Sequence, residues 1–345
     1  MGRTISRTTR AGVVAGCFLL VLAGCSSGSE GSGDASSAAS TAAGFPVTMT
    51  RCGQELSFDA PPERTVTVNQ ASTEIQLALG VHEHMVGTAA WSDQVLDEYA
   101  DENAGIEQLA MNYPSLEAVL DKNPDLVTAA FEYTFTDEGI AGQERFAELG
   151  VPAYLPEYEC TIVNNNTTGE HLAMDDIYQE IRDLAAIHGV VGRGDELVAE
   201  LQARMDAAAQ TARDAGSEGR SVFYWYSSNE APYSAGGIGA PQIAADTVGV
   251  TNIYADSDQE WPQVTWEDVA AKNPDVLVLG DLKREMNSGD TADDKIAYLE
   301  SNPVTAQMDA VRNRRYVIVP GSSLDPSMRT VDLTEALAGV LAESA

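Results

Sequence analysis

The sequence predicts an α/β protein of two Rossmann-like lobes with parallel sheets, joined by a single long bridging helix, with a ligand cleft between the lobes. The first supporting observation is an internal duplication. Residues 115–127 (SLEAVLDKNPDLV) align without gaps on residues 265–277 (TWEDVAAKNPDVL), and both copies contain the run Lys-Asn-Pro-Asp. The offset of 150 residues (265 minus 115) is far longer than the roughly 20–50 residues of a solenoid unit, which indicates two similar domains.

The second observation is an alternation of helical and strand patterns. Each copy of the duplicated segment has an amphipathic helix, a Pro-Asp break and an apolar strand, at 125–130 and 275–280. Proline ends a helix because its ring clashes one turn back and it lacks an N–H. The alternation favours parallel sheets, although chance similarity between two common helix–strand units is an alternative. Further β-rich segments predict strands at 64–69, 85–90, 153–156, 221–226 and 315–320.

The third observation is a long helical stretch near the middle of the chain. A helix is predicted at 174–188, and a second from Asp195 to about Ala215 with leucines and other apolar residues on one face. The second helix lacks strand neighbours, so we interpret it as the bridge. The predicted domains are an N-terminal lobe at 45–192, a bridging helix at 193–217 and a C-terminal lobe at 218–345.

The N-terminus has the pattern of an export signal. Three arginines precede an apolar stretch at 11–22, which is too short to span a bilayer stably. We therefore expect a signal peptide at 1–24. The tetrapeptide LAGC that ends at Cys25 resembles the lipobox of bacterial lipoproteins, in which Cys25 carries the lipid. An ordinary signal peptide with a coincidental cysteine is the alternative.

The composition of the mature chain indicates its surroundings. Residues 25–44 are rich in Ser, Gly and Ala and predict a flexible tether. We therefore expect a lipid-anchored protein on the extracellular face of the cell membrane. The net charge of −33 is spread along the chain and disfavours nucleic-acid binding. In an oxidising compartment Cys52 and Cys160 are expected to form a disulfide, with two free thiols as the alternative.

Several short segments carry a family resemblance. They are PPERTVTV at 61–68, STEIQLALG at 72–80, PSLE at 114–117, NPD at 123–125 and 273–275, VTWE at 264–267 and NPV at 302–304. In this order and spacing they resemble the substrate-binding lipoproteins of ATP-driven (ABC) importers, in the class that takes up ferric siderophores, haem and cobalamin (class III periplasmic binding proteins).

This resemblance implies a function. It implies a monomer, not an enzyme and without a cofactor of its own, that holds a ligand in its cleft and delivers it to an ABC permease and its ATPase. By motif match, Glu74 and Asp246 would each present an acidic group to the permease, one on each lobe. Glu74 also lies near a predicted helix N-terminus, where the helix dipole favours an acid, and that is its alternative role.

The carboxyl ends of the predicted strands supply candidate ligand contacts without reference to any family. They are rich in aromatic residues with polar tips, which suit a bulky, partly planar ligand. The predicted ligand-binding residues are Trp91, Tyr133, Tyr158, Trp225, Tyr226, Tyr233, Trp261 and Arg329. A place in the core explains each aromatic residue about as well. Arg329, followed by Lys283 and Arg284, is the candidate for contact with an anionic ligand, and solvated surface is the alternative.

One departure from the family pattern bears on the ligand. Hydroxamate binders of this family commonly place an arginine three residues before the proline that matches Pro114, and here that residue is Met111. The departure argues against a hydroxamate siderophore and leaves another ferric siderophore, haem or a corrinoid as the candidate cargo. Tyr133 does fall where such binders often place a ligand-contacting tyrosine.

Other kinds of site find less support in the sequence. A direct metal site needs three or four ligands converging from both lobes, and the histidines (His82, His84, His171 and His188) are predicted at the surface. The glycine-rich run at 236–241 lacks the spacing of a phosphate loop and predicts a flexible segment at the cleft edge. The alternative functions are a secreted lipid-anchored α/β hydrolase acting in the cleft and a sensor lipoprotein without transport partners.

Overall fold

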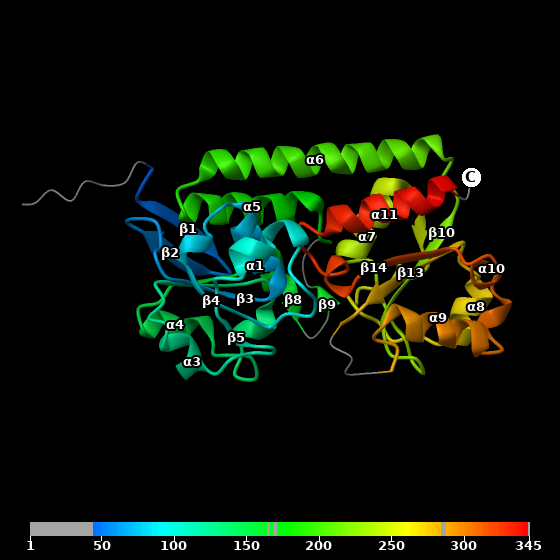
Figure 1. Cartoon of the computed structure of the whole chain (residues 1–345), viewed down its shortest axis with the longest axis horizontal. Coiled ribbons are helices and arrows are strands. Elements are labelled where there is room, and N and C mark those ends of the chain that lie inside the picture. The colour runs from blue at the N-terminus through cyan, green and yellow to red at the C-terminus, as the bar shows by residue number, and fades with distance from the viewer. Residues whose placement is uncertain (1–43, 164–165, 168–170, 284–287, 344–345) are drawn as a thin grey trace, which may run out of the picture. The chain divides into compact units, whose positions relative to one another are not determined.

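The computed structural model describes residues 44–163, 166–167, 171–283 and 288–343 (Figure 1). The predicted signal peptide, Cys25 and all but the last residue of the predicted tether lie outside the described residues. Within the described ranges, no helix is both long enough and apolar enough to cross a bilayer.

The first lobe is built on a parallel sheet of five strands in the order β5-β4-β3-β6-β7. The strands are β3 (Thr65–Val68), β4 (Met85–Ala89), β5 (Gln108–Ala110), β6 (Leu126–Ala129) and β7 (Ala153–Tyr154). All residues of β3 and β6 are buried, as expected for parallel strands covered on both faces. The helices are α1 (Gln70–Ala78), α2 (Ala100–Asn103), α3 (Leu116–Leu120), α4 (Gln143–Glu148) and α5 (Met174–Ile187).

The second lobe repeats this plan with one change. Its strands are β10 (Ser221–Ser227), β11 (Tyr233–Ser234), β12 (Thr251–Asn252), β13 (Val276–Asp281) and β14 (Tyr316–Pro320). The order is β11-β10-β13-β14, β12 pairs with β10, and β11 alone in this sheet is antiparallel. The helices are α7 (Ala240–Val248), α8 (Trp266–Lys272), α9 (Ala292–Ser301), α10 (Asp309–Arg312) and α11 (Thr330–Glu343).

The strands predicted from β-rich segments are all present in the two sheets. The prediction missed the short strands β5, β11 and β12, and two hairpins, β1 (Val47–Arg51) with β2 (Gln54–Phe58) and β8 (Ile162–Val163) with β9 (Asn166–Thr167). A strand of two or three residues shows no alternation of polar and apolar residues, so its pairing depends on neighbours that the local sequence does not reveal.

The duplicated segments form the same structure in separate sheets. Ser115 and Thr265 each cap their helix, α3 or α8, by accepting a backbone N–H bond at the third helical residue. Asn123 and Asn273 each follow the helix in the left-handed conformation, with φ of 47° and 46°. Asparagine tolerates this conformation better than most residues, so both copies turn towards the sheet at the same point.

The aspartate that follows the proline in each copy forms a hydrogen bond with the backbone at the start of the neighbouring strand in the sheet. The carboxylate of Asp125 accepts the backbone N–H of Arg64 at 2.8 Å, just before β3. The carboxylate of Asp275 accepts the backbone N–H of Ser221 at 2.8 Å, at the start of β10. In each lobe this bond lies where the strand that follows the duplicated helix pairs with the first strand of its sheet, β6 with β3 and β13 with β10. The repeated sequence therefore encodes the same strand pairing twice.

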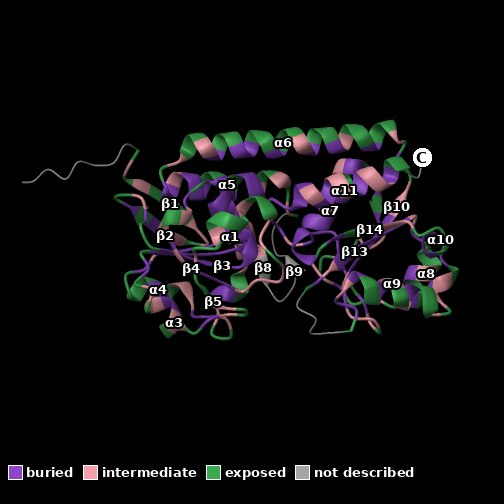
Figure 2. Ribbon diagram, in the orientation of Figure 1, coloured by how far each residue is buried: buried purple, intermediate pink, exposed green. Residues whose placement is uncertain are grey.

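The bridging helix is α6 (Val191–Asp214), close to the predicted range. Figure 2 shows that its outer face is exposed while its inner face is buried against the helices below. Leu197, Leu201 and Met205 belong to the core of the first lobe, whereas Ala208 and Ala212 belong to the core of the second. One rigid helix therefore contributes to both cores.

The two lobes also share apolar packing below this helix. Ile243 of α7, with Met328 and Val331 near the start of α11, joins the core cluster of the first lobe. Close-packed interiors resist deformation, so this shared packing limits how far the lobes can move apart.

The glycine-rich run before α7 is buried, so the prediction of a flexible segment is wrong. A side chain at Gly236 would lie 1.9 Å from the carbonyl oxygen of Gln259, and one at Gly237 would lie 2.0 Å from that of Ala255. The glycines are needed because two backbone segments pass in direct contact.

The disulfide predicted between Cys52 and Cys160 is present, with a Cα–Cα distance of 5.2 Å. It fastens the β1–β2 hairpin to the first lobe. Arg51, beside the disulfide, also forms an ion pair with Asp183 of α5, with 2.6 Å between Nε and Oδ2.

We expect the Cys52→Ser/Cys160→Ser variant to unfold at a lower denaturant concentration than the wild type. The bond closes a loop with a sequence separation of 108 residues. In the chain-entropy model such a loop contributes about 4.7 kcal/mol to the free energy of unfolding. Equilibrium urea unfolding measures this, with reduced wild type as the control. Equal midpoints for the oxidised wild type and the variant would contradict the assignment.

Candidate functional site

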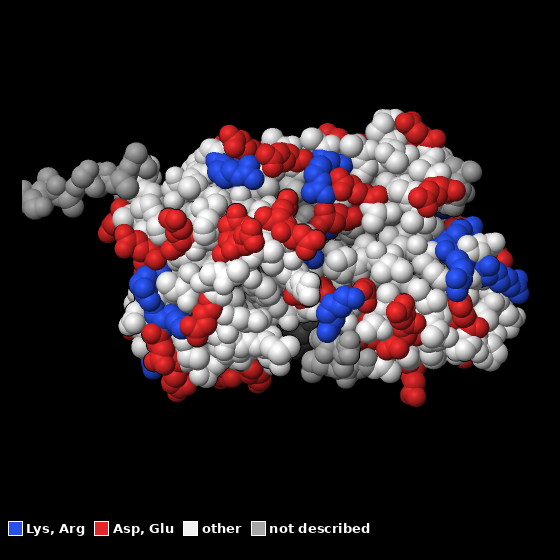
Figure 3. All heavy atoms as spheres, viewed as in Figure 1, with Lys and Arg blue, Asp and Glu red and all other residues white. Residues whose placement is uncertain are grey.

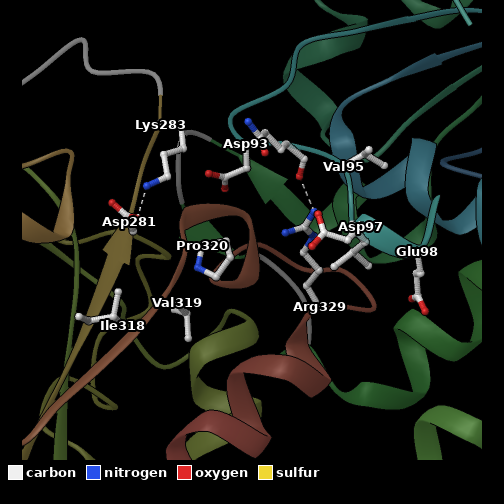
Figure 4. A pocket seen from close by; sticks show the side chains of 12 residues that line it. Asp93, Val95, Asp97, Glu98, Asp281, Lys283, Ile318, Val319, Pro320 and Arg329 are labelled. Carbon is white, nitrogen blue, oxygen red and sulfur yellow. Dashed lines mark hydrogen bonds and ion pairs between the residues drawn. The ribbon is translucent and has the colours of Figure 1, made fainter. Parts of the chain in front are cut away.

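A pocket of about 600 Å³ lies where the two lobes meet. It is formed at the carboxyl ends of β4, β13 and β14, the position where α/β sheets commonly bind ligands (Figure 4). The lining residues are Asp93, Gln94, Val95, Leu96, Asp97, Glu98, Asp281, Lys283, Ile318, Val319, Pro320 and Arg329.

A second pocket of about 490 Å³ adjoins the first and shares Asp93 and Lys283 with it. It adds Trp91 and Met111 to the lining. Met111 is 72% exposed and Ile318, in the first pocket, is 51% exposed. These two side chains supply apolar surface that a ligand in the pockets can cover.

An ion pair between the lobes forms one wall of the first pocket. Arg329 Nε donates to Glu74 Oε2 at 2.7 Å, and Arg329 Nη2 donates to Glu74 Oε1. Glu74 comes from α1 of the first lobe and is 0% exposed, whereas Arg329 precedes α11 of the second lobe and is 3% exposed. A buried charge needs such a partner because its own desolvation is unfavourable.

Two further hydrogen bonds join the lobes beside this ion pair. Arg329 Nη2 also donates to the Gln94 carbonyl oxygen at 2.8 Å, and the backbone N–H of Ser322 donates to Asp93 Oδ2 at 2.7 Å. We call these five residues (Glu74, Asp93, Gln94, Ser322 and Arg329) the interlobe clasp. The clasp places the Asp93–Gln94 loop of the first lobe against the second.

The structure contradicts the docking role predicted for Glu74, whereas Arg329 lines the pocket but has its charge already paired. Glu74 cannot meet a permease while its carboxylate is buried, and Arg329 offers no free positive charge to an anionic ligand because Glu74 neutralises it. A motif match selected Glu74 and a position near the end of the last strand selected Arg329, and neither signal could show that the two residues pair across 255 positions.

Asp246, the second predicted docking residue, lies exposed on α7. Its carboxylate accepts a hydrogen bond from Gln242 Nε2 at 2.8 Å. Its role in docking stays a prediction.

Trp225 is a core residue, so the prediction that it contacts ligand is wrong. It is 0% exposed, and its indole Nε1 donates to the carbonyl oxygens of Ser227 and Ser228 at 3.1 and 2.9 Å. Its ring lies edge-on to Trp266, with 4.6 Å between the ring centroids. The end of β10 folds back over this indole, and the local sequence does not reveal that contact.

The remaining predicted aromatic contacts are dispersed. Tyr226 and Trp261 pack on each other with centroids 4.6 Å apart and extend the core of the second lobe. Tyr133 is 48% exposed and Tyr233 is 36% exposed. Of the ligand contacts predicted from the sequence, Trp91 and Arg329 line the two pockets described above.

Several pocket residues were not predicted. The loop that follows β4 provides Asp93, Asp97 and Glu98, and β14 provides Ile318. The rule that ligands bind beyond strand ends selects Trp91 but not the residues further along this loop. Its polar sequence, SDQVLDE at 92–98, was the available signal. Arg284 lies outside the described residues.

The histidines are not all at the surface. His188 is 5% exposed, and burial lowers its pKa to about 4. Its Nε2 lies 3.1 Å from Gln76 Oε1. Among the described residues, no group of three or more His, Cys, Asp or Glu side chains is arranged to hold a metal ion.

Tyr158 makes a buried contact with an acid of unusual pKa. Its hydroxyl donates to Glu180 Oε2 at 3.0 Å. Burial raises the pKa of Glu180 to about 8, although the hydrogen bond from Tyr158 favours the charged form. The folded protein therefore holds a proton at Glu180 that the unfolded chain releases above its ordinary pKa of 4.5.

We expect Glu180→Gln to remove a pH dependence of stability. In the wild type the free energy of unfolding should fall as pH rises from the ordinary pKa to the raised one, by up to about 1.4 kcal/mol per pH unit. The amide of the variant keeps an acceptor for Tyr158 and does not ionise. Urea unfolding between these pH values measures the slope, with exposed Glu102→Gln as the control. An unchanged slope in Glu180→Gln would contradict the assignment.

We expect the clasp to show strong coupling in a double-mutant cycle. Glu74→Leu leaves Arg329 buried without a partner and should cost about 3–5 kcal/mol, and Arg329→Met should cost a similar amount. Glu74→Leu/Arg329→Met should cost far less than the sum, because no charge remains buried. Chemical unfolding of the four proteins measures this. Additive costs would show that the two side chains do not interact.

Known proteins share this architecture. A vitamin B12-binding protein from Pectobacterium carotovorum is 25% identical over 223 residues, covering 64% of this chain and 72% of the relative. An uncharacterised ABC transporter substrate-binding lipoprotein from Bacillus subtilis is 25% identical over 276 residues, covering 79% of this chain and 81% of the relative.

Solved structures show the same fold. The structure of an ABC-type Fe3+-hydroxamate transport system from Saccharomonospora viridis has a TM-score of 0.69 at 26% identity, and the alignment covers 86% of this chain and 99% of that chain. A periplasmic binding protein from Veillonella parvula has a TM-score of 0.72 at 24% identity, covering 85% and 96% respectively. A family model described as periplasmic binding protein matches residues 66–322, well over half of this chain. With its two sheets and bridging helix, this chain belongs to the periplasmic binding protein family.

Proposed function

We propose that this protein is the extracellular receptor of an ABC importer. It captures a ferric siderophore, haem or a corrinoid between its lobes and delivers the ligand unchanged to the permease. The observation that carries the proposal is the pocket lined by strand ends of both lobes. A ligand held there touches both lobes at once, so occupancy is coupled to their relative position.

The size and lining of the site support a bulky ligand. The pocket of about 600 Å³ and its neighbour of about 490 Å³ are of the size that binds large organic molecules. Trp91, Met111 and Ile318 supply apolar surface, whereas acidic side chains supply hydrogen-bond acceptors. A metal chelate or corrinoid presents both kinds of surface.

The relatives support the same class of cargo. Their names include vitamin B12-binding, cobalamin-binding, haem-binding and Fe3+-hydroxamate transport proteins. They are named as binding or transport proteins, which supports capture without chemistry.

Delivery requires an anchor and a partner. We propose that lipid on Cys25 holds the mature protein at the membrane and that residues 26–44 act as the tether. A tethered receptor meets its permease at a high effective concentration. Asp246, exposed on α7, remains the candidate contact with the permease on the second lobe.

We expect Ile318→Thr to weaken ligand binding about tenfold, because it removes apolar surface that the ligand covers. Isothermal titration of the mature protein with a ferric siderophore, haem and cyanocobalamin measures the dissociation constants. Val191→Thr is the matched control, since Val191 is 54% exposed at the start of α6 and lies outside the two pockets. No binding of any of the three ligands, or equal loss in both variants, would refute the proposed site.

A further inference from the structure

Among the described residues that line the pocket between the lobes, acids outnumber bases. Its carboxylates come from Asp93, Asp97, Glu98 and Asp281, and its cations from Lys283 and Arg329. A third pocket, which shares Asp281 and Lys283, adds Asp293 and Asp294. The charge that a ligand meets depends on which of these groups are already paired.

Both described cations are paired within the protein. Figure 4 shows Lys283 directed at Asp281, with which it forms an ion pair. Arg329 is paired with Glu74, and the two side chains are 4% and 1% exposed. Arg329 is not available to an anionic ligand without the loss of a buried ion pair, and the exposed ammonium group of Lys283 is partly neutralised by Asp281.

Two acids in the same lining lack such neutralisation. Among the residues that the structure describes, neither Asp97 nor Glu98 forms an ion pair, although the Tyr99 hydroxyl bonds to Glu98. Asp93 differs from them because it interacts with both cations and its Oδ2 accepts a backbone N–H from Ser322. An ionised carboxylate is purely a hydrogen-bond acceptor. The exposed polar surface of the pocket therefore attracts N–H donors and positive charge, and it repels carboxylates and phosphates.

The surface around the pocket has the same sign. The chain carries a net charge of −33, and Figure 3 shows acidic side chains spread over both lobes with few basic ones between them. Such a field raises the encounter rate of cations and lowers that of anions. The long-range field and the local lining therefore select for the same ligands.

Building on the proposed function, we infer that the ligand is a neutral or cationic metal chelate or corrinoid that has peripheral N–H donors and no free anionic groups. Its apolar part covers Trp91, Met111 and Ile318, and its amide or amine groups donate to Asp97 and Glu98. The clasp contributes to this selectivity because Glu74 holds Arg329 neutralised.

Two matched ligand pairs test the inference by isothermal titration of the mature protein. The first is a corrinoid with amide side chains against the same corrinoid with these amides hydrolysed to carboxylates. The second is a linear ferric trihydroxamate with a terminal amine against its succinylated derivative, which ends in a carboxylate. We expect the amide or amine member of at least one pair to bind tenfold or more tightly than its carboxylate counterpart.

A variant tests whether the pocket causes the preference for amide or amine ligands over carboxylate ligands. Asp97→Asn should reduce the preference about threefold, because one unpaired carboxylate becomes neutral. Asp101→Asn, an exposed position on α2 outside the pockets, changes the net charge equally and should leave the preference unchanged. An equal loss in both variants would assign the selectivity to the general field of the protein and overturn the role of the pocket.

The outcomes separate this inference from the proposed function. Binding of a carboxylate member as tightly as, or more tightly than, its partner would overturn the charge preference while the capture of a chelate or corrinoid stands. Binding of none of the four ligands, with no binding of haem either, would refute both. Binding of haem alone, which carries two propionate groups, would overturn the charge preference and leave the proposed capture standing. Binding restricted to the amide or amine members, with the loss of this preference confined to Asp97→Asn, supports the inference.

Discussion

The ion pair between Glu74 and Arg329 joins the two lobes at a point that water does not reach. Either charge would be strongly destabilising there without its partner. Because one partner comes from each lobe, the ion pair favours the present relative position of the lobes. The same contact holds the Asp93–Gln94 loop against the second lobe and so shapes the pocket wall. The geometry of the site therefore depends on a contact between residues far apart in sequence.

Helix α6 acts together with this ion pair. Its apolar face contributes to both cores, and side chains of the second lobe continue the core of the first. A rigid helix over shared packing resists large hinge motion, because close-packed side chains deform little. Small adjustments of the lobes around a bound ligand fit this construction better than wide opening does, and a permease would then recognise a modest change in shape.

The charges of the pocket follow from the same arrangement. Among the described residues two cations line it, each paired with a carboxylate of the protein, so the unpaired acids dominate the charge that a ligand meets. Exposed apolar side chains such as Met111 and Ile318 provide the complementary surface for an organic ligand. The site combines apolar contact with hydrogen-bond acceptors, a combination that suits amide-bearing or cationic cargo.

The sequence by itself determined the local structure and the two-fold plan. The duplicated Lys-Asn-Pro-Asp segments encode equivalent helix ends and strand pairings. Proline and left-handed asparagine act on their near neighbours, and the aspartate accepts a backbone N–H beside the adjacent strand. Periodicity also located α6, and the cysteine count predicted the disulfide. Only the tertiary structure determined that Glu74, Trp225 and Arg329 are buried and that Glu74 pairs with Arg329. Burial and pairing depend on residues that come together only when both lobes have folded.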